Sequence, residues 1–283
     1  MDLAAQPTSA VETEFVLTPA DFDRIRQLIH QRAGISLHAG KQAMVYSRLS
    51  RRLRVSGRRS FTDYLRWLEH GSGNPEWQEF INCLTTNLTA FFREEHHFQA
   101  LSDDLRERLR ESASAPRRIW CSAASTGEEP YSLAMTVSET LGPAALVRIV
   151  CSDIDTQVLA TAQRGVYGAD ARGLGPAHLK RHFLRGTGAN RGHIRVRPEL
   201  ARLLAFMPFN LMSRNWSALG EPFDIVFCRN VMIYFDSPTQ RTVLERMHAV
   251  LRPGGLLYVG HSENFSEARD LFRLRGKTIY ERL

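Results

Sequence analysis

Short apolar segments separated by amphipathic stretches fill the second half of the chain, and this alternation restricts the possible folds more than any other feature. The apolar segments cover 119–122, 146–151, 224–228 and 256–259, and helical periodicity covers about 129–141, 156–164 and 238–251. Strands that alternate with helices form parallel sheets whose two faces are covered. We therefore predict an α/β domain with a doubly wound, mostly parallel sheet.

The alternation is interrupted between residues 166 and 206. Gly186, Gly188 and Gly192 surround an expected turn, and the segment Ile194-Arg195-Val196-Arg197 alternates apolar and basic side chains. Such an alternation is typical of a half-buried strand. We predict that 166–206 is a small antiparallel β subdomain inserted into the α/β domain.

The first part of the chain has a different, helical pattern. Thr18-Pro19-Ala20-Asp21 is a typical helix start, and further helices are expected over about 38–56, from Ser60, and from Asn74 to Leu84. We therefore predict a small all-α domain over 15–86, preceded by a disordered tail at 1–14 and followed by the α/β domain at 87–283.

Charge and cysteine usage narrow the class of protein. The formal net charge of +7 favours an acidic partner, which can be nucleic acid, an anionic surface or an acidic protein. No apolar run approaches the ~18 residues that a membrane-spanning helix needs, and no basic stretch near the N-terminus leads into an apolar one. The four cysteines are far apart, and His96 and His97 are adjacent rather than one helical turn apart. We expect a cytoplasmic protein with no metal site.

Polar segments at 122–132, 152–155 and 229–230 follow three of the predicted strands, and open α/β sheets bind their ligands at such strand ends. Ser122–Ser132 joins a strand to a helix, but it lacks both the dinucleotide and the phosphate-loop glycine patterns. Its acids Glu128 and Glu129 suit a cationic or hydroxyl-bearing ligand, or they are simply favourable at a helix start. Asp153 is placed to accept hydrogen bonds from a ribose, whereas Asp155 is expected to cap the following helix.

Five segments taken together resemble the CheR-type chemotaxis receptor methyltransferases: Thr85–Glu94, Ser122–Ser132, Ser152–Asp155, Cys228–Asp236 and Gly260–Phe265. These enzymes use S-adenosyl-L-methionine to methylate glutamate side chains of chemoreceptors for sensory adaptation, and they release S-adenosyl-L-homocysteine. The resemblance spans about 15–283. It implies a class I S-adenosylmethionine-dependent methyltransferase fold for 87–283, a receptor-recognition role for the helical domain, and a monomer.

The resemblance also implies roles for individual residues. The cofactor-binding residues would be Asn87, Thr89, Arg93, Glu129, Asp153, Asn210, Leu211, Arg229 and Asn230. Arg93 and Tyr234 would lie at the methyl-transfer centre.

Receptor binding is expected at two places. Seven basic residues and no acid lie between Lys41 and Arg59, and five of them are candidates for contact with a glutamate-rich receptor helix: Lys41, Arg48, Arg51, Arg52 and Arg54. A merely solvated basic face or a nucleic-acid site are the alternatives. In the insertion, Gly188, Arg195 and Arg197 are candidates for docking a receptor C-terminal peptide, with a lid over the cofactor as the alternative.

Two other function classes stay open from the residues alone. The basic balance suits a nucleic-acid methyltransferase, although the chain has neither an Asp/Asn-Pro-Pro-aromatic motif nor a Pro-Cys nucleophile. A non-catalytic module that only binds the cofactor or a receptor is the second alternative.

Overall fold

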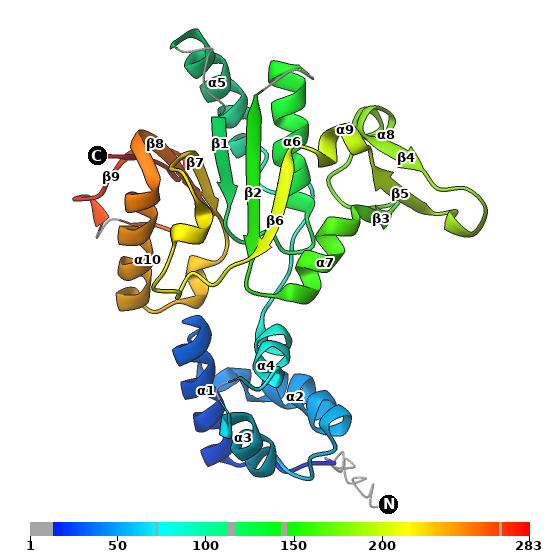
Figure 1. Ribbon diagram of the computed structural model, residues 1–283, viewed down its shortest axis with the longest axis vertical. Helices are drawn as coiled ribbons and strands as arrows, with labels where there is room; N and C mark the ends of the chain where they lie inside the picture. Colours follow the sequence, from blue (N-terminus) through cyan, green and yellow to red (C-terminus); the bar gives the residue numbers. More distant parts are fainter. Residues whose placement is uncertain (1–13, 72, 112–116, 143–145, 266–267) are drawn as a thin grey trace, which may run out of the picture.

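The computed structural model describes residues 14–71, 73–111, 117–142, 146–265 and 268–283. The tail predicted at 1–14 lies outside the described residues except for Glu14. The larger unit is a seven-stranded sheet in the order β6-β2-β1-β7-β8-β10-β9, and a separate three-stranded sheet has the order β3-β5-β4. Figure 1 shows the larger unit above a smaller helical one, with the three-stranded sheet at the side.

The parallel part of the large sheet contains the four strands expected from the apolar segments. These are β1 (Arg117–Cys121), β2 (Val147–Asp153), β7 (Phe223–Cys228) and β8 (Leu251–Val259). β1 pairs in parallel with β2 and with β7, and β7 pairs in parallel with β8. Their carboxyl ends therefore meet at one edge, as the doubly wound prediction requires.

Three strands of this sheet were not predicted as part of it. β6 (Leu204–Pro208) pairs in parallel with β2, whereas β10 (Ile279–Arg282) pairs antiparallel with both β8 and β9 (Phe272–Gly276). Residues 204–206, assigned to the insertion from sequence, thus belong to the large sheet. Leu204, Ala205 and Phe206 lack the period-2 alternation that would have marked a strand, because β6 is only partly buried on both faces.

Helices cover both faces of the large sheet. They are α5 (His96–Glu111), α6 (Glu128–Leu141), α7 (Thr156–Arg164) and α10 (Ser237–Val250), of which α5 was not predicted. The apolar side chains form two separate cores, one with α5 and α6 and the other with α10 and the 209–219 loop. Ile119 belongs to the first core and Trp120 to the second, because successive side chains of β1 point to opposite faces.

The helical unit consists of α1 (Pro19–Ala33), α2 (Gln42–Ser56), α3 (Phe61–Glu69) and α4 (Glu76–Leu84) around its own apolar core. Thr18 and Asp21 form the expected capping box at the start of α1. Gly34 ends the helix with a φ of 72°, and a Cβ at this position would lie 2.7 Å from the Met212 sulfur. Glycine is therefore required where α1 approaches the larger unit.

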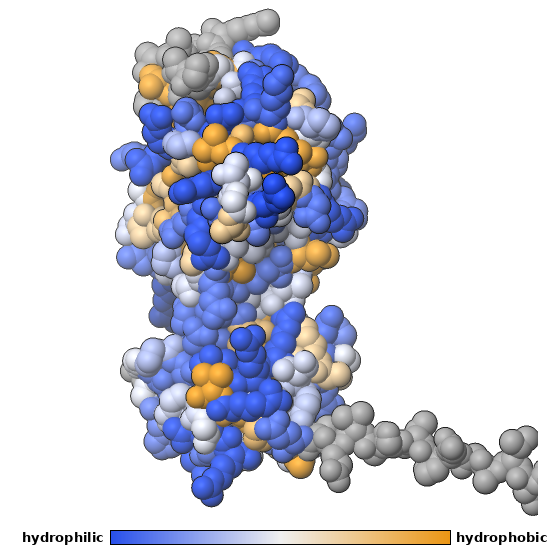
Figure 2. Space-filling view, turned by 90° about the vertical axis from the view of Figure 1, so that its right-hand side faces the viewer, coloured by the Kyte–Doolittle hydropathy of each residue, from blue (hydrophilic) through white to orange (hydrophobic). Residues whose placement is uncertain are grey.

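The inserted sheet is made of β3 (Val166–Gly168), β4 (Phe183–Arg185) and β5 (His193–Val196), with α8 (Pro176–His182) leading into β4 and α9 (Pro198–Ala201) following β5. Both pairings of the central strand β5 are antiparallel, as predicted. Figure 2 looks onto the side of the molecule that carries this sheet and shows a mostly hydrophilic face whose outline narrows between the two units.

Hydrogen bonds join the two units at two places. In the first, Gln78 and Asn82 of α4 bond to Ile154 and Thr156 at the start of α7. The second place is the end of α1. Ile35 and Phe235 form an isolated antiparallel bridge, and the Ser36 N–H donates to the Tyr234 carbonyl at 2.7 Å. His30 Nε2 lies 2.9 Å from Asp236 Oδ2, and the Asn210 amide donates to the Arg32 carbonyl at 2.7 Å. The end of α1 is thereby attached to the carboxyl edge of the sheet. No helix among the described residues is long and apolar enough to cross a membrane.

Candidate active site

A cavity of about 390 Å³ lies where the helical unit meets the carboxyl edge of the large sheet. Its walls come from the strand ends of the larger unit, from the 85–93 linker, and from Ser36 to Met44 of the helical unit. All the residues to which the resemblance assigns cofactor binding or catalysis line it, namely Asn87, Thr89, Arg93, Glu129, Asp153, Asn210, Leu211, Arg229, Asn230 and Tyr234. Segments that are distant in sequence thus converge on one site.

Asp153 lies at the end of β2 and holds the loop after β1. Its Oδ2 accepts a 2.8 Å hydrogen bond from the Ser125 N–H, and its Oδ1 accepts one of 2.9 Å from the Asp155 N–H. Ser125 has a φ of 48°, a conformation that this bond helps to hold. Burial raises the pKa of Asp153 to about 6, although the two backbone N–H groups oppose that shift. The carboxylate oxygens retain lone pairs that can accept a ligand's hydroxyl groups.

Asp155 is a helix cap, as predicted, and it also orders the linker. Its Oδ1 accepts from the Gln157 and Val158 N–H groups at the start of α7. Its Oδ2 accepts from the Thr85 hydroxyl at 2.7 Å and from the Asn87 amide at 2.9 Å. One carboxylate therefore connects the second strand end to the linker, and the side-chain amide of Asn87 is used within the protein.

Arg229, which follows β7, is held entirely inside the protein. Only 1% of its side chain is exposed, its Nη1 donates to Glu129 Oε2 at 2.7 Å, and its Nη2 donates to the Arg93 carbonyl. Burial raises the pKa of Glu129, while the Arg229 charge acts in the opposite direction. The guanidinium therefore joins α6, β7 and the linker, and it is not available as a free cation for a ligand.

Arg93 from the linker and Tyr234 from the segment after β7 both line the cavity. Nη1 of Arg93 donates to the Leu88 carbonyl at 3.0 Å, and no ion-pair partner for this guanidinium is found among the described residues. Tyr234 is half-buried, and its ring packs against the apolar cores of both units. A guanidinium side chain and a tyrosine side chain thus line the same cavity.

Asn210 and Leu211 form another wall beside Phe209 and Ile154. The Asn210 Oδ1 accepts from the Met212 N–H at 2.9 Å, and its amide donates to the Arg32 carbonyl. This wall is apolar at Phe209 and Leu211, which are almost fully buried. A flat aromatic group suits it better than a charged one.

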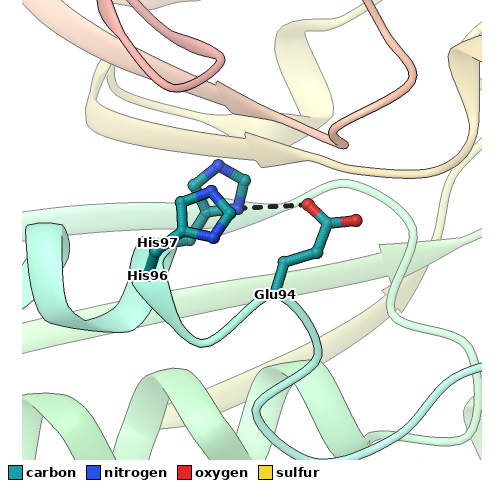
Figure 3. A group of neighbouring side chains, drawn as sticks. All are labelled: Glu94, His96 and His97. Carbon is teal, nitrogen blue, oxygen red and sulfur yellow. Dashed lines mark ion pairs between the residues drawn. The ribbon is translucent and has the colours of Figure 1, made fainter.

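Glu94, His96 and His97 bring potential metal-ligand atoms within 4.8 Å of one another, as Figure 3 shows. Glu94 Oε2 lies 3.5 Å from His97 Nδ1 and only 3.3 Å from Arg229 Nη2. A metal cation at this oxygen would lie beside a buried guanidinium, which repels it. The geometry favours a network of charges and hydrogen bonds over a metal centre. The adjacent histidines alone did not indicate that Glu94 lies with them.

Several residues of the site had not been singled out from sequence. Glu263 is buried and accepts from the backbone N–H groups of Gly260, Asn230 and Met232. His38 and Met44 line the cavity from the helical unit. Glu263 lies in the Gly260–Phe265 segment, for which the sequence suggested no bonding role. It bonds to the backbone after β7 because a turn at Gly260 directs it there.

The basic residues of α2 have different environments, and two of them are bonded within the protein. Arg52 forms a two-bond ion pair with the buried Glu76, at 2.8 and 2.6 Å, and Arg48 donates to the carbonyls of Cys83 and Thr85. Both guanidiniums hold α2 to the α4 segment, and this bonding argues against their use by a receptor. Helical spacing placed them on the flank of Lys41, and α4 covers that flank.

The other candidates, Lys41 just before α2 and Arg51 and Arg54 on it, are exposed. Lys41 lies at the cavity, Arg51 is exposed, and Arg54 forms an exposed ion pair with Glu14. In the insertion, Gly188 has a φ of 57°, Arg195 is exposed on β5, and Arg197 is half-buried after it. Since β5 is the central strand, an added strand can pair only with β3 or β4.

The cavity fits S-adenosyl-L-methionine by the chemistry of its walls. The acids Asp153 and Glu129 suit hydroxyl and cationic groups, and the Phe209–Leu211 wall suits an adenine ring. The short Ser122–Gly127 loop bears no lysine for a phosphate. Asp153, Glu129 and Asn210 are the residues that would hold the cofactor.

Comparisons with known proteins agree with this geometry. Residues 20–85 match the family model of the CheR methyltransferase all-alpha domain, and residues 87–280 match that of the CheR methyltransferase SAM binding domain. The chain is 54% identical over 266 residues to a chemotaxis protein methyltransferase of Klebsiella aerogenes, covering 93% of this chain and 90% of the relative. It is 53% identical to that of Escherichia coli K12, with 93% and 91% covered, and 53% identical to chemotaxis protein methyltransferase 2 of Pseudomonas aeruginosa, with 94% of each covered. The chain therefore belongs to the CheR family of S-adenosylmethionine-dependent methyltransferases.

Proposed function

We propose that the protein transfers a methyl group from S-adenosyl-L-methionine to glutamate side chains of bacterial chemoreceptors, forming methyl esters. The observation that carries this proposal is the single cavity that presents Arg93 and Tyr234 to the same space as Asp153 and Glu129. The names of the relatives support a chemotaxis substrate.

The chemistry of the acceptor explains what the site contains. A glutamate side chain has a pKa of about 4.3, so it is already a carboxylate at neutral pH and needs no general base. S-adenosyl-L-methionine supplies the methyl group on its sulfonium. The protein has mainly to hold two reactants in line, and such positioning supplies roughly 7–11 kcal/mol of a barrier.

Arg93 is the residue that we assign to the incoming carboxylate. Its guanidinium is bonded to one backbone carbonyl and faces the cavity, so N–H groups remain for a substrate oxygen. A carboxylate clamped by two strong bonds would lose nucleophilicity, and a single orienting bond avoids this loss. We assign Tyr234, which lines the same cavity, to contact near the methyl group.

The receptor would approach from the helical unit. Lys41 lies at the cavity, and Arg51 and Arg54 are exposed farther along the same segment. A glutamate-rich helix complements these charges and is steered toward the cavity by them. We also assign the protein to the cytoplasm, because its four cysteines are far apart in the sequence. We assign it as a monomer, because a receptor helix needs free access to this face.

The inserted sheet would dock a second part of the receptor, a C-terminal peptide. Leu184 on β4 and Val166 on β3 are partly exposed on the two edge strands, 42% and 39% respectively, and Arg195 lies on the strand between them. A peptide that pairs with an edge strand gains backbone hydrogen bonds, and basic side chains would meet its carboxylates. An enzyme docked to a short flexible receptor segment would have a local concentration at the methylation sites of roughly millimolar.

One assay tests the proposal against its alternatives. Purified protein is incubated with receptor-bearing membranes and cofactor carrying a tritiated methyl group, with nucleic acid and buffer in parallel. Label on the receptor that mild base releases as methanol is expected, since carboxyl methyl esters are base-labile. Label on nucleic acid, base-stable label on protein, or no transfer would each refute glutamate methylation.

A further inference from the structure

Glu94 occupies a constrained position directly after Arg93. Its backbone has a φ of 58°, which costs a non-glycine residue energy, and 12% of its side chain is exposed. The resemblance assigns this residue no function, and nothing in the proposed mechanism uses it. A strained, nearly buried carboxylate at the edge of a site requires an explanation from its contacts.

Besides His97 on its own segment, Glu94 contacts residues that follow β7 and β8. Oε1 accepts from the Asn230 amide at 3.2 Å, Oε2 lies 3.3 Å from Arg229 Nη2, and Oε2 also accepts from the His261 N–H at 3.1 Å. The His261 ring adds Nδ1 at 3.1 Å from Oε1. One carboxylate therefore joins the linker to the end of β7 and to the loop after β8.

The charge of Glu94 is strongly favoured. Burial alone would raise its pKa, but Arg229 and the hydrogen bonds from His261 and Asn230 lower the pKa to about 2. The side chain is thus an anion in any neutral solution, and its bonds to Asn230 and Arg229 are charge-assisted.

Asn230 is held by two carboxylates, those of Glu94 and Glu263. It has a φ of 57°, its N–H donates to Glu263 Oε2 at 2.9 Å, and its amide group donates to Glu94. Arg229 Nη2 meanwhile donates to the carbonyl of Arg93, the residue before Glu94. The linker is therefore connected to the segment after β7 by two bonds, one between Arg93 and Arg229 and the other between Glu94 and Asn230.

We propose that Glu94 is a positioning residue, which holds Asn230 and the backbone of Arg93 in the arrangement that binds S-adenosyl-L-methionine. Its carboxylate has no need to touch the reacting atoms, because it acts through the two residues that line the cavity. For turnover the inference rests on the proposed function, whereas for cofactor affinity it depends only on the family's cofactor.

The test compares Glu94→Gln with Glu95→Gln. The first change keeps the shape and removes the charge, and the second is a control at the exposed neighbouring position. Calorimetry with S-adenosyl-L-homocysteine should show about tenfold weaker binding by Glu94→Gln, the expected loss of one charge-assisted hydrogen bond, and unchanged binding by Glu95→Gln. The KM for S-adenosyl-L-methionine should rise by more than kcat falls, and Glu94→Asp, which is too short to reach both partners, should not restore affinity.

A double-mutant cycle separates positioning from a general loss of stability. Glu94→Gln and Asn230→Ala should be strongly non-additive in affinity for S-adenosyl-L-homocysteine, since the first removes the charge of the acceptor and the second the donor of the same hydrogen bond. Unchanged affinity in Glu94→Gln, or additive effects, would overturn the inference. Should Glu94→Gln fail to fold, Asn230→Ala alone must weaken product binding, and normal binding there would overturn the inference too. Absence of receptor methylation by the parent protein would refute the proposed function and leave this binding test intact.

Discussion

The Arg229 guanidinium lies 2.7 Å from Glu129 Oε2, and only 1% and 12% of the two side chains are exposed. This pair connects Arg229, the residue after β7, to the first turn of α6. Since Arg229 is also bonded to the Arg93 carbonyl, the pair orders three walls of the site at once. Removing either partner leaves the other charge buried.

Replacing Glu129 with glutamine should therefore lower the free energy of unfolding. Breaking a buried ion pair costs about 3–5 kcal/mol. The loss should lie near the lower value, because Arg229 keeps a second anion, Glu94, at 3.3 Å. Urea unfolding followed by circular dichroism measures the change. Glu128→Gln is the matched control, because this neighbouring carboxylate is bonded to the Thr126 hydroxyl and forms no ion pair in the described residues. Equal stability of the two variants would contradict the role of the pair.

Cofactor affinity should depend on pH through Asp153. Its pKa is raised from 3.8 to about 6, so between these values the unfolded chain ionises first and folding stability falls as the pH rises. A ligand hydroxyl that donates to the carboxylate reverses this preference, and affinity for S-adenosyl-L-homocysteine should increase as the pH rises through 6. Calorimetry between pH 5 and 8 measures it, and Asp153→Asn should bind weakly with a flat profile. The same slope in that variant would assign the titration to another group.

Arg93→Ala should reduce turnover far more than thermal stability. Its side chain makes one hydrogen bond, to a backbone carbonyl, so little packing is lost. A residue that orients the reacting carboxylate acts in the transition state, and kcat and kcat/KM should fall together. Arg93→Lys should restore little, because an ammonium does not reproduce the planar fork. Near-normal methylation by Arg93→Ala would limit the residue to a structural role.

Two neighbouring arginines of α2 should give opposite phenotypes. Arg52→Ala leaves Glu76 buried without its partner and should lower the melting temperature of the helical unit. Arg51→Glu changes an exposed charge, so it should preserve the melting temperature and slow methylation of membrane-bound receptor. Differential scanning calorimetry and initial methylation rates at two salt concentrations distinguish them. Unaltered rates in Arg51→Glu would exclude this face from receptor binding.

Arg195→Glu should weaken the binding of a receptor C-terminal peptide without changing cofactor affinity. The side chain is exposed on the central strand of the insertion and is not among the residues that line the cavity. Arg214→Glu makes the same charge change at another exposed site and serves as the control. Fluorescence anisotropy of a labelled peptide is the readout. Equal peptide binding by both variants, or no binding by the parent, would leave the insertion as a lid.

The elements with strong local patterns were predictable, and those defined by their neighbours were not. The Thr18 cap, the Gly34 and Gly57 helix ends and the four buried strands follow from short-range residue preferences. β6 was missed because its partly buried residues do not alternate, and α5 because it follows the linker without a recognisable cap. Both take their place from packing against the large sheet.

The same distinction applies to the site. The resemblance located the residues that line the cavity, but not how their side chains are used. Sequence spacing cannot reveal that Arg229 is neutralised by Glu129, or that α4 supplies the partner of Arg52. These pairings join residues 100 and 24 positions apart, so only the tertiary fold brings them together.

Ile35 bridges to Phe235 and Ser36 bonds to Tyr234, so both units are fixed around the cavity that they line together. A ligand in a cavity with walls from both units favours their association over their separation, so its binding free energy is added to that of the interface. At a hundredfold excess over its dissociation constant, such a ligand contributes about 2.7 kcal/mol. Chain cleaved in the linker should accordingly reassemble more tightly when the cofactor is present, since the cofactor then adds its own contacts to those between the two units.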